Sequence, residues 1–139
     1  MELAELKVLV VESNMPTIES VCDHIGRLGI HHPLIAETGR DAYQLFKDKL
    51  PDIVLMEAML PDMDGFSLAK QMRKLEGEGD WSVIIFLTSM SKDEHLERGI
   101  DAGADDYMLK PVRGVVLKGK IRAMHRLLQM QRKWVEVSR

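Results

Sequence analysis

Residues that can carry chemistry stand directly after the apolar runs of this chain. Glu57 ends the run of residues 52–56, and its carboxylate has the chemistry of a nucleophile or a cation ligand. Three other runs also end in reactive side chains. The first is followed by the carboxylate of Glu12 and the hydroxyl of Ser13. The other two end in the hydroxyls of Thr88 and Ser89 and in the amine of Lys110. The question that these residues raise is whether the fold brings them together.

Five strand-like runs alternate with five segments of helical period. The predicted strands are residues 7–11, 33–36, 52–56, 82–88 and 107–110. The predicted helices are residues 16–28, 40–49, 65–75, 91–103 and 115–139, and Ser91 with Glu94 forms a capping-box signal for the fourth of them. This alternation predicts an α/β fold with a five-stranded parallel sheet, doubly wound by helices on both faces.

A doubly wound sheet would place the chemical residues at one edge. In such folds the functional crevice lies beyond the carboxyl ends of the strands, where the strand order reverses. Each candidate residue stands at such an end. We therefore expect the residues at these strand ends to converge on one crevice: Glu12, Ser13, Glu57, Thr88, Ser89 and Lys110.

The composition indicates one ordinary globular domain. The 139 residues are 45% hydrophobic and 29% charged, with a formal net charge of −3, so no basic surface for nucleic acid is expected. The single cysteine, Cys22, cannot form an internal disulfide, and its place on an apolar helix face predicts a buried, inert thiol. No apolar run approaches the roughly 18 residues of a membrane span, and the N-terminus is acidic, so we expect a cytoplasmic protein without membrane contacts.

Several motifs occur in the order and at the spacing of a known family. They are "VLVVESN", "PDIVLMEAMLPDMDGF", "LTSM" and "GIDAGADDYMLKPV". Over residues 6 to 125 the chain resembles a response-regulator receiver domain of two-component signalling systems. The resemblance implies a flavodoxin-like fold with strand order 2-1-3-4-5. It also implies a role in phosphorelay signal transduction rather than an enzyme, with a sensor histidine kinase upstream and an output domain or partner protein downstream.

The resemblance assigns a role to each candidate residue. In that family an aspartate at the position of Glu57 accepts a phosphoryl group, and Lys110 pairs with the acyl phosphate that forms. The magnesium ligands map to Glu12, Ser13, Glu57 and the backbone carbonyl of Met59. The residues that contact the phosphoryl group or move on activation map to Thr88, Ser89 and Tyr107.

Two departures from the family pattern fall on this site. Glutamate at position 57 carries its carboxylate about one ångström further out, and a misplacement of that size costs on the order of 10²-fold in rate. Ser13 removes one carboxylate from the cation site, which weakens magnesium binding. We expect a degenerate pseudo-receiver that signals without efficient phosphorylation, needs no cofactor and binds Mg²⁺ weakly at most.

Glu57 could itself act as a partial substitute for the phosphorylated residue. A phosphoryl group carries a charge of about −1.5 to −2 with three acceptor oxygens, whereas a carboxylate carries one charge and two oxygens. Any bias toward the active state would therefore be incomplete. Two alternatives stay open: a conventional phosphoacceptor altered by natural or deliberate substitution, and a non-switching scaffold or dimerisation module.

Other function classes fit the residues less well. A phosphatase of the haloacid dehalogenase type needs a second aspartate two residues after the first, where this chain has Met59. A flavodoxin needs a phosphate cradle after the first strand, and residues 12–17 have no glycine-rich or hydroxyl-rich loop. His31 and His32 stand in a predicted loop without other metal ligands, so solvent-exposed side chains are expected.

The predicted last helix is longer than the domain needs. Residues 115–139 would span about 37 Å. Leu117, Ile121, Met124 and Leu128 are spaced to pack on the sheet, while Ala123, Leu127, Met130, Trp134 and Val137 are spaced like a short coiled-coil seam. We therefore divide the chain into a receiver domain, residues 1–125, and a helical linker extension, residues 126–139. The extension resembles linkers that join receivers to an output domain, often a diguanylate cyclase, in a homodimer.

Overall fold

A five-stranded parallel sheet forms the centre of the protein. The computed structural model describes residues 1–138. The strands are β1 (Val8–Val11), β2 (Leu34–Ala36), β3 (Ile53–Met56), β4 (Val83–Thr88) and β5 (Asp106–Leu109). All neighbouring strands run parallel in the order β2-β1-β3-β4-β5, which confirms the α/β fold and the strand order that the family resemblance implied.

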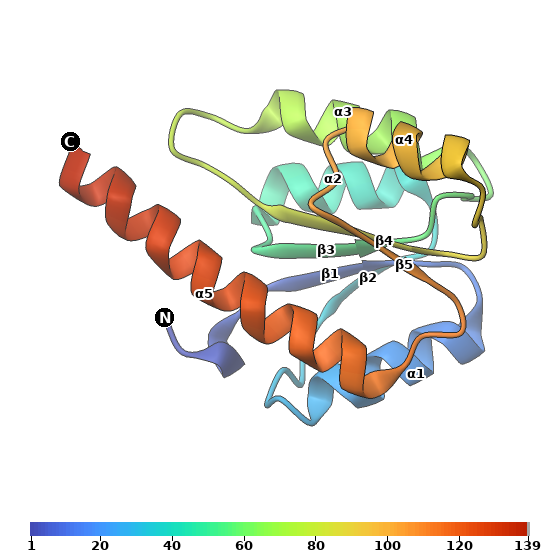
Figure 1. Ribbon diagram of the computed structural model, residues 1–139, viewed down its shortest axis with the longest axis horizontal. Coiled ribbons are helices and arrows are strands. Elements are labelled where there is room, and N and C mark those ends of the chain that lie inside the picture. The colour runs from blue at the N-terminus through green and yellow to red at the C-terminus, as the bar shows by residue number, and fades with distance from the viewer. Residues whose placement is uncertain (139) are drawn as a thin grey trace.

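Helices cover both faces of the sheet. After a short 3-10 turn, η1 (Leu3–Glu5), they are α1 (Met15–Gly26), α2 (Gly39–Lys49), α3 (Gly65–Leu75), α4 (Asp93–Asp101) and α5 (Gly114–Ser138). Helices α1 and α5 lie on one face, and α2, α3 and α4 lie toward the other (Figure 1). No helix within residues 1–138 has the length and apolar character needed to cross a membrane.

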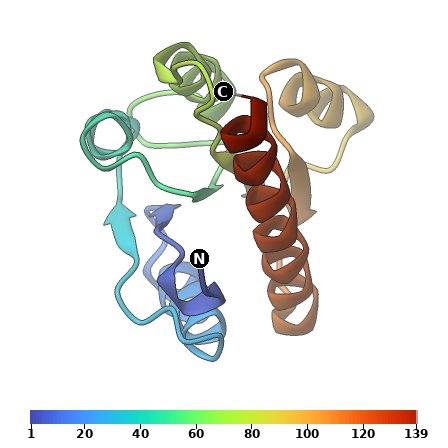
Figure 2. The same ribbon diagram turned by 90° about the vertical axis from the view of Figure 1, so that its left-hand side faces the viewer.

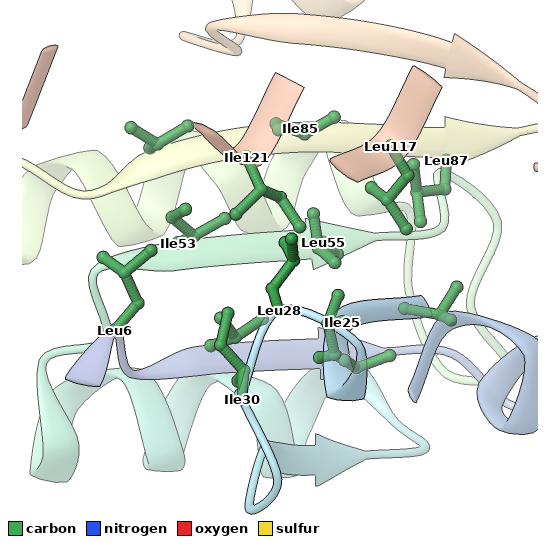
Figure 3. Packing of buried hydrophobic residues seen from close by; sticks show 14 of the residues in the cluster. Leu6, Ile25, Leu28, Ile30, Ile53, Leu55, Ile85, Leu87, Leu117 and Ile121 are labelled. Carbon is green, nitrogen blue, oxygen red and sulfur yellow. The ribbon is translucent and has the colours of Figure 1, made fainter. Parts of the chain in front are cut away.

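The strands are uniformly apolar because both faces are covered. Every residue of β1, β3 and β4 is buried, as expected for a parallel sheet between two helical layers. On one face, Leu117 and Ile121 of α5 point toward the strand that carries Leu55 (Figure 3). On the other face, α2 and α3 contribute Phe46 and Met72 to a second buried cluster.

Side-chain caps fix the starts of the first three helices. Asn14 accepts a hydrogen bond from the backbone of Thr17, and Thr38 and Asp64 cap α2 and α3 in the same way. The predicted Ser91–Glu94 capping box is wrong. Helix α4 instead begins after Lys92, which provides no side-chain cap.

Helix α1 differs in two details from the sequence prediction. It ends at Gly26 rather than at residue 28, because the chain turns through Gly29 with a φ of 90°. Leu28 still lies in the core. Cys22 is partly rather than fully buried, and this burial raises the pKa of its thiol, which keeps the thiol protonated at neutral pH.

Helix α5 packs on the domain well beyond residue 125. Leu128 is fully buried in the same cluster as Leu117 and Ile121, and Met124 packs against that cluster, so the predicted inner row is confirmed. Further along, Arg132 forms an ion pair with Asp52 at 2.5 Å (Nη2 to Oδ1). The N-terminal segment lies beside this part of α5 (Figure 2). The division of the chain into two parts at residue 125 remains a prediction. The contacts of α5 with the rest of the domain continue to Arg132.

Candidate functional site

The backbone positions of the site residues are set by the sheet. Glu57 donates its backbone N–H to the carbonyl of Val11 at 2.9 Å, and Lys110 donates its own to the carbonyl of Thr88 at 2.9 Å. These bonds continue the pairing of β1 with β3 and of β4 with β5 by one residue beyond the strands. The strand ends that carry Glu57 and Lys110 therefore lie together at the carboxyl end of the sheet, as predicted.

An ion-paired group of three side chains occupies this edge. The ammonium of Lys110 donates to Oε1 of Glu57 at 2.8 Å and also to Oε1 of Glu12. The side chain of Lys110 is 17% exposed, that of Glu57 13% and that of Glu12 6%. Solvent therefore screens the attraction between these charges only weakly. Burial alone would lower the pKa of Lys110, but its hydrogen bonds to Glu12 and Glu57 raise it above the usual value. The lysine is therefore charged at neutral pH.

The second oxygen of each carboxylate is held by the backbone. Oε2 of Glu57 accepts from the N–H groups of Ala58 at 2.5 Å and Met59 at 3.3 Å. Oε2 of Glu12 accepts from the N–H groups of Ser13 at 3.0 Å and Asn14 at 3.3 Å. Both carboxylates are thus fixed at both oxygens, and neither is a freely rotating acid.

Thr88 and Tyr107 meet at the backbone of Met90. The buried Thr88 hydroxyl accepts from the N–H of Met90 at 3.3 Å, and the Tyr107 hydroxyl donates to its carbonyl at 2.7 Å. The Tyr107 ring packs beside Phe86, with ring centroids 6.0 Å apart. Burial, and then the charge of Glu57, raise the pKa of Tyr107, so its hydroxyl remains a donor. Ser89, in contrast, is exposed.

Comparison with known proteins decides the family. Residues 8–122 match the sequence profile of the response regulator receiver domain. The chain belongs to this family. It is 38% identical to the transcriptional regulatory protein AfsQ1 of Streptomyces coelicolor, over 69% of this chain and 41% of that protein. It is 32% identical to the phosphate regulon transcriptional regulatory protein PhoB of Escherichia coli, over 86% of this chain and 52% of that protein.

Solved receiver structures agree with this assignment. The BeF3-activated DrrB receiver domain has a TM-score of 0.77 at 27% identity, covering 91% of this chain and 99% of that one. A two-component response regulator from Clostridium difficile has a TM-score of 0.81 at 23% identity, covering 88% of this chain and 97% of that one, and supports the fold alone. The protein is thus a receiver domain of two-component signalling, and it spans about half the length of the curated relatives.

The residues of this receiver domain do not fit the divalent cation that the family typically uses for phosphorylation. Magnesium requires several oxygen ligands in near-octahedral order at about 2.0–2.1 Å. Here the ammonium of Lys110 bonds to both candidate carboxylates, Glu12 and Glu57. Ser13 offers an exposed hydroxyl in place of a third carboxylate. Among residues 1–138, no three His, Cys, Asp or Glu side chains are grouped to hold a metal ion.

Two aspartates of the β3–α3 loop have roles that the sequence reading missed. Aspartate is a common turn residue, so the residue types at positions 62 and 64 indicate no more than a turn. Asp62 accepts from the N–H groups of Gly39 at 2.8 Å and Arg40 at 3.0 Å, at the start of α2. Asp64 caps α3 and also pairs with Arg98 of α4 at 3.0 Å. The loop that follows Glu57 is therefore bound to the start of α2 through Asp62 and to α4 through Asp64.

These bonds lower the pKa values of both aspartates. The backbone hydrogen bonds from Gly39 and Arg40 lower the pKa of Asp62. Burial alone would raise the pKa of Asp64, but hydrogen bonds from residues 66 and 67 and the charge of Arg98 lower it. A carboxyl group that is more acidic in the folded chain stabilises the fold above its ordinary pKa. That contribution is lost as the pH falls through the lowered value.

The Asp62→Asn variant should be less sensitive to acid than the unchanged chain. We expect it to melt at a lower temperature at neutral pH, because an amide is a weaker acceptor than a carboxylate for the N–H groups at the start of α2. Its melting temperature should then fall less between neutral pH and about pH 3, because the amide does not titrate in the range of aspartate. Circular dichroism melts measure both effects. Asp101→Asn at an exposed position is the control, and an acid profile of Asp62→Asn parallel to that of the control would contradict the assignment.

Most predicted site residues come together, although their roles remain predictions. Glu12, Glu57 and Lys110 are in direct contact, while Thr88 and Tyr107 are joined through Met90. The exposed side chains of Ser13 and Met59 lie outside the hydrogen bonds of this group. The exposure predicted for His31 and His32 is confirmed. Met90 was not predicted as a site residue, and its backbone role leaves no signal in residue type.

Proposed function

We propose that this receiver domain transmits a signal without being efficiently phosphorylated. The observation that carries the proposal is the 2.8 Å ion pair between Glu57 and Lys110. In the family the corresponding lysine pairs with the acyl phosphate, and here a carboxylate already holds it. Receiver domains act between histidine kinases and output domains, and Glu57 would replace the chemical input with a built-in charge.

The hydrogen bonds of Glu57 make it a poor nucleophile. Attack on a phosphorus atom needs a free lone pair aligned with the leaving group. Oε1 is engaged by Lys110, and Oε2 by the backbone N–H groups of Ala58 and Met59. The longer side chain also displaces both oxygens by about one ångström from where an aspartate would hold them. Both effects lower the rate of phosphotransfer.

The charge of Glu57 supports a partial active state. One carboxylate supplies less charge and fewer acceptor oxygens than a phosphoryl group, whose charge is about −1.5 to −2. Thr88, the predicted phosphoryl-contact residue, accepts a hydrogen bond from Met90. Because Glu57 supplies less charge than a phosphoryl group, it shifts the domain only part of the way toward the active state. Binding of a partner protein would complete that shift.

The output of the signal lies outside the described fold. The curated relatives are named as transcriptional regulators, and this chain spans about half of their length. We infer that α5 passes the signal to an output domain or partner protein, with no catalytic activity in the receiver domain itself. A diguanylate cyclase output remains a prediction, and so does a sensor histidine kinase as upstream partner.

Intact-mass spectrometry after incubation with a small acyl-phosphate donor and Mg²⁺ tests the proposal. We expect no phosphoryl adduct on the unchanged chain, because Glu57 is held at both oxygens. A receiver domain with an aspartate at this position, treated in parallel, shows that the donor is active. A clear phosphoryl adduct on the unchanged chain that survives acid and is lost in base would contradict the proposal.

A dimerisation module is the second candidate function, and exposed apolar residues on α5 favour it. Leu127, Met130, Trp134 and Val137 are between 46% and 75% exposed and follow a three-four spacing. A second copy in parallel orientation fits this stripe. Arg126 and Lys133 flank it on the same side, so an antiparallel partner would set like charges against each other, whereas a parallel partner would not.

The Trp134→Ala variant should weaken self-association. Trp134 is 70% exposed and lies in the middle of the stripe, so its truncation removes contact area without disturbing the core. Sedimentation velocity over a range of concentrations measures the effect. Arg122→Ala, an exposed position on another side of α5, is the matched control. Equal sedimentation of both variants and the unchanged chain would count against the module.

A further inference from the structure

The ammonium of Lys110 lies where two acidic side chains require a positive charge. It contacts one oxygen of Glu57 at 2.8 Å and one oxygen of Glu12. An ammonium has three donors and no acceptor, so a single lysine can serve both carboxylates at once. The group of three carries a net charge of −1 and lies largely out of solvent.

A divalent cation and this ammonium would compete for the same oxygens. Two positive charges within about 4 Å repel strongly in a site of low dielectric. The second oxygen of each carboxylate is also engaged, because it accepts hydrogen bonds from the backbone N–H groups of residues 13–14 or 58–59. Binding of the cation would require Lys110 to leave and both carboxylates to turn.

Ser13 decides which of the two positive groups is preferred. A carboxylate at this position would bring the site to three negative charges, and one ammonium could then balance only one of them. A divalent ion would be favoured in that case, because affinity for such ions rises with ligand charge. With a neutral hydroxyl at residue 13, two carboxylates face one lysine.

We propose that Lys110 is the resident counter-ion of Glu12 and Glu57 and takes the place of the divalent cation in this receiver domain. This inference rests on the proposed function and deepens it, since it states what holds the site in place of metal. It makes the fold around the site independent of Mg²⁺. It also makes a latent cation site that opens when Lys110 is removed or when a third carboxylate is added.

Magnesium titrations of the full chain and two variants test this inference by calorimetry and by thermal melting. The unchanged chain should show no saturable binding and no change of melting temperature with millimolar Mg²⁺. Lys110→Met should melt lower without Mg²⁺ and recover with it, and its affinity for Mg²⁺ should rise at least on the order of 10²-fold, the effect of removing one nearby unit charge. Ser13→Asp should also gain binding, and it keeps the test open if Lys110→Met does not fold.

A third variant separates the site from other acidic surfaces. Glu12→Gln combined with Lys110→Met should lose the gained affinity, because one of the two carboxylate ligands is removed. The inference is overturned if the unchanged chain binds Mg²⁺ as tightly as the variants, if neither single variant gains binding, or if Glu12→Gln has no effect. Magnesium binding by the unchanged chain without a phosphoryl adduct would overturn this inference alone, whereas an adduct would overturn the proposed function.

Discussion

The double variant Glu57→Asp/Ser13→Asp should form an acyl phosphate with a small phosphodonor and Mg²⁺, at a rate at least on the order of 10²-fold above that of the unchanged chain. The shorter side chain withdraws the carboxylate from the N–H groups of Ala58 and Met59, which hold Glu57. The added carboxylate at residue 13 supplies the missing cation ligand. Intact-mass spectrometry over a time course measures the rate.

The single variants show whether both changes are needed. Glu57→Asp alone should gain little, because the cation site still lacks a carboxylate and Lys110 still balances the charge. Glu57→Gln combined with Ser13→Asp is the matched control, since it restores the cation ligand without a nucleophile. If Glu57→Asp alone reached the rate of the double variant, the loss of the acid at residue 13 would be irrelevant to phosphotransfer.

The Leu128→Ala variant should lose about 2–5 kcal/mol of unfolding free energy. Leu128 is fully buried and belongs to the core cluster under α5, although it lies beyond the predicted domain boundary at residue 125. Removing its side chain leaves a cavity that the surrounding residues fill only in part. Urea denaturation measures the loss from the midpoint and slope of the transition.

The neighbouring residue provides a control on the same helix turn. Leu127 is 46% exposed, so Leu127→Ala should change the unfolding free energy by no more than about 0.5 kcal/mol. A large difference between the two variants would extend the folded domain to at least residue 128. Equal losses would mean that α5 does not dock on the sheet at this point.

Much of the fold follows from local sequence patterns. The apolar runs predict all five strands within one residue at every end, because strands buried on both faces must be apolar throughout. The strand order came from the family resemblance, since it depends on crossovers between elements. The start of α4 could not be predicted, because Ser91 and Glu94 match a capping pattern while the chain enters the helix one residue later, at Lys92.

The site was predictable in its location and not in its bonds. Strand ends of a parallel sheet share one edge, so the meeting of Glu12, Glu57 and Lys110 follows from the topology. Which oxygen each donor selects depends on side-chain rotamers, which residue types do not encode. The pairing of Arg98 with Asp64 joins residues 34 positions apart, and no periodicity signals it.

Helix α5 runs from the carboxyl ends of the strands to their amino ends. It begins four residues after Lys110, and its Arg132 is fastened to Asp52, directly before the start of β3. Its 25 residues form one unbroken helix of about 37 Å. If a helix of this length tilted at the Lys110 end, its far end would be displaced further than its start, and the ion pair between Arg132 and Asp52 would have to break.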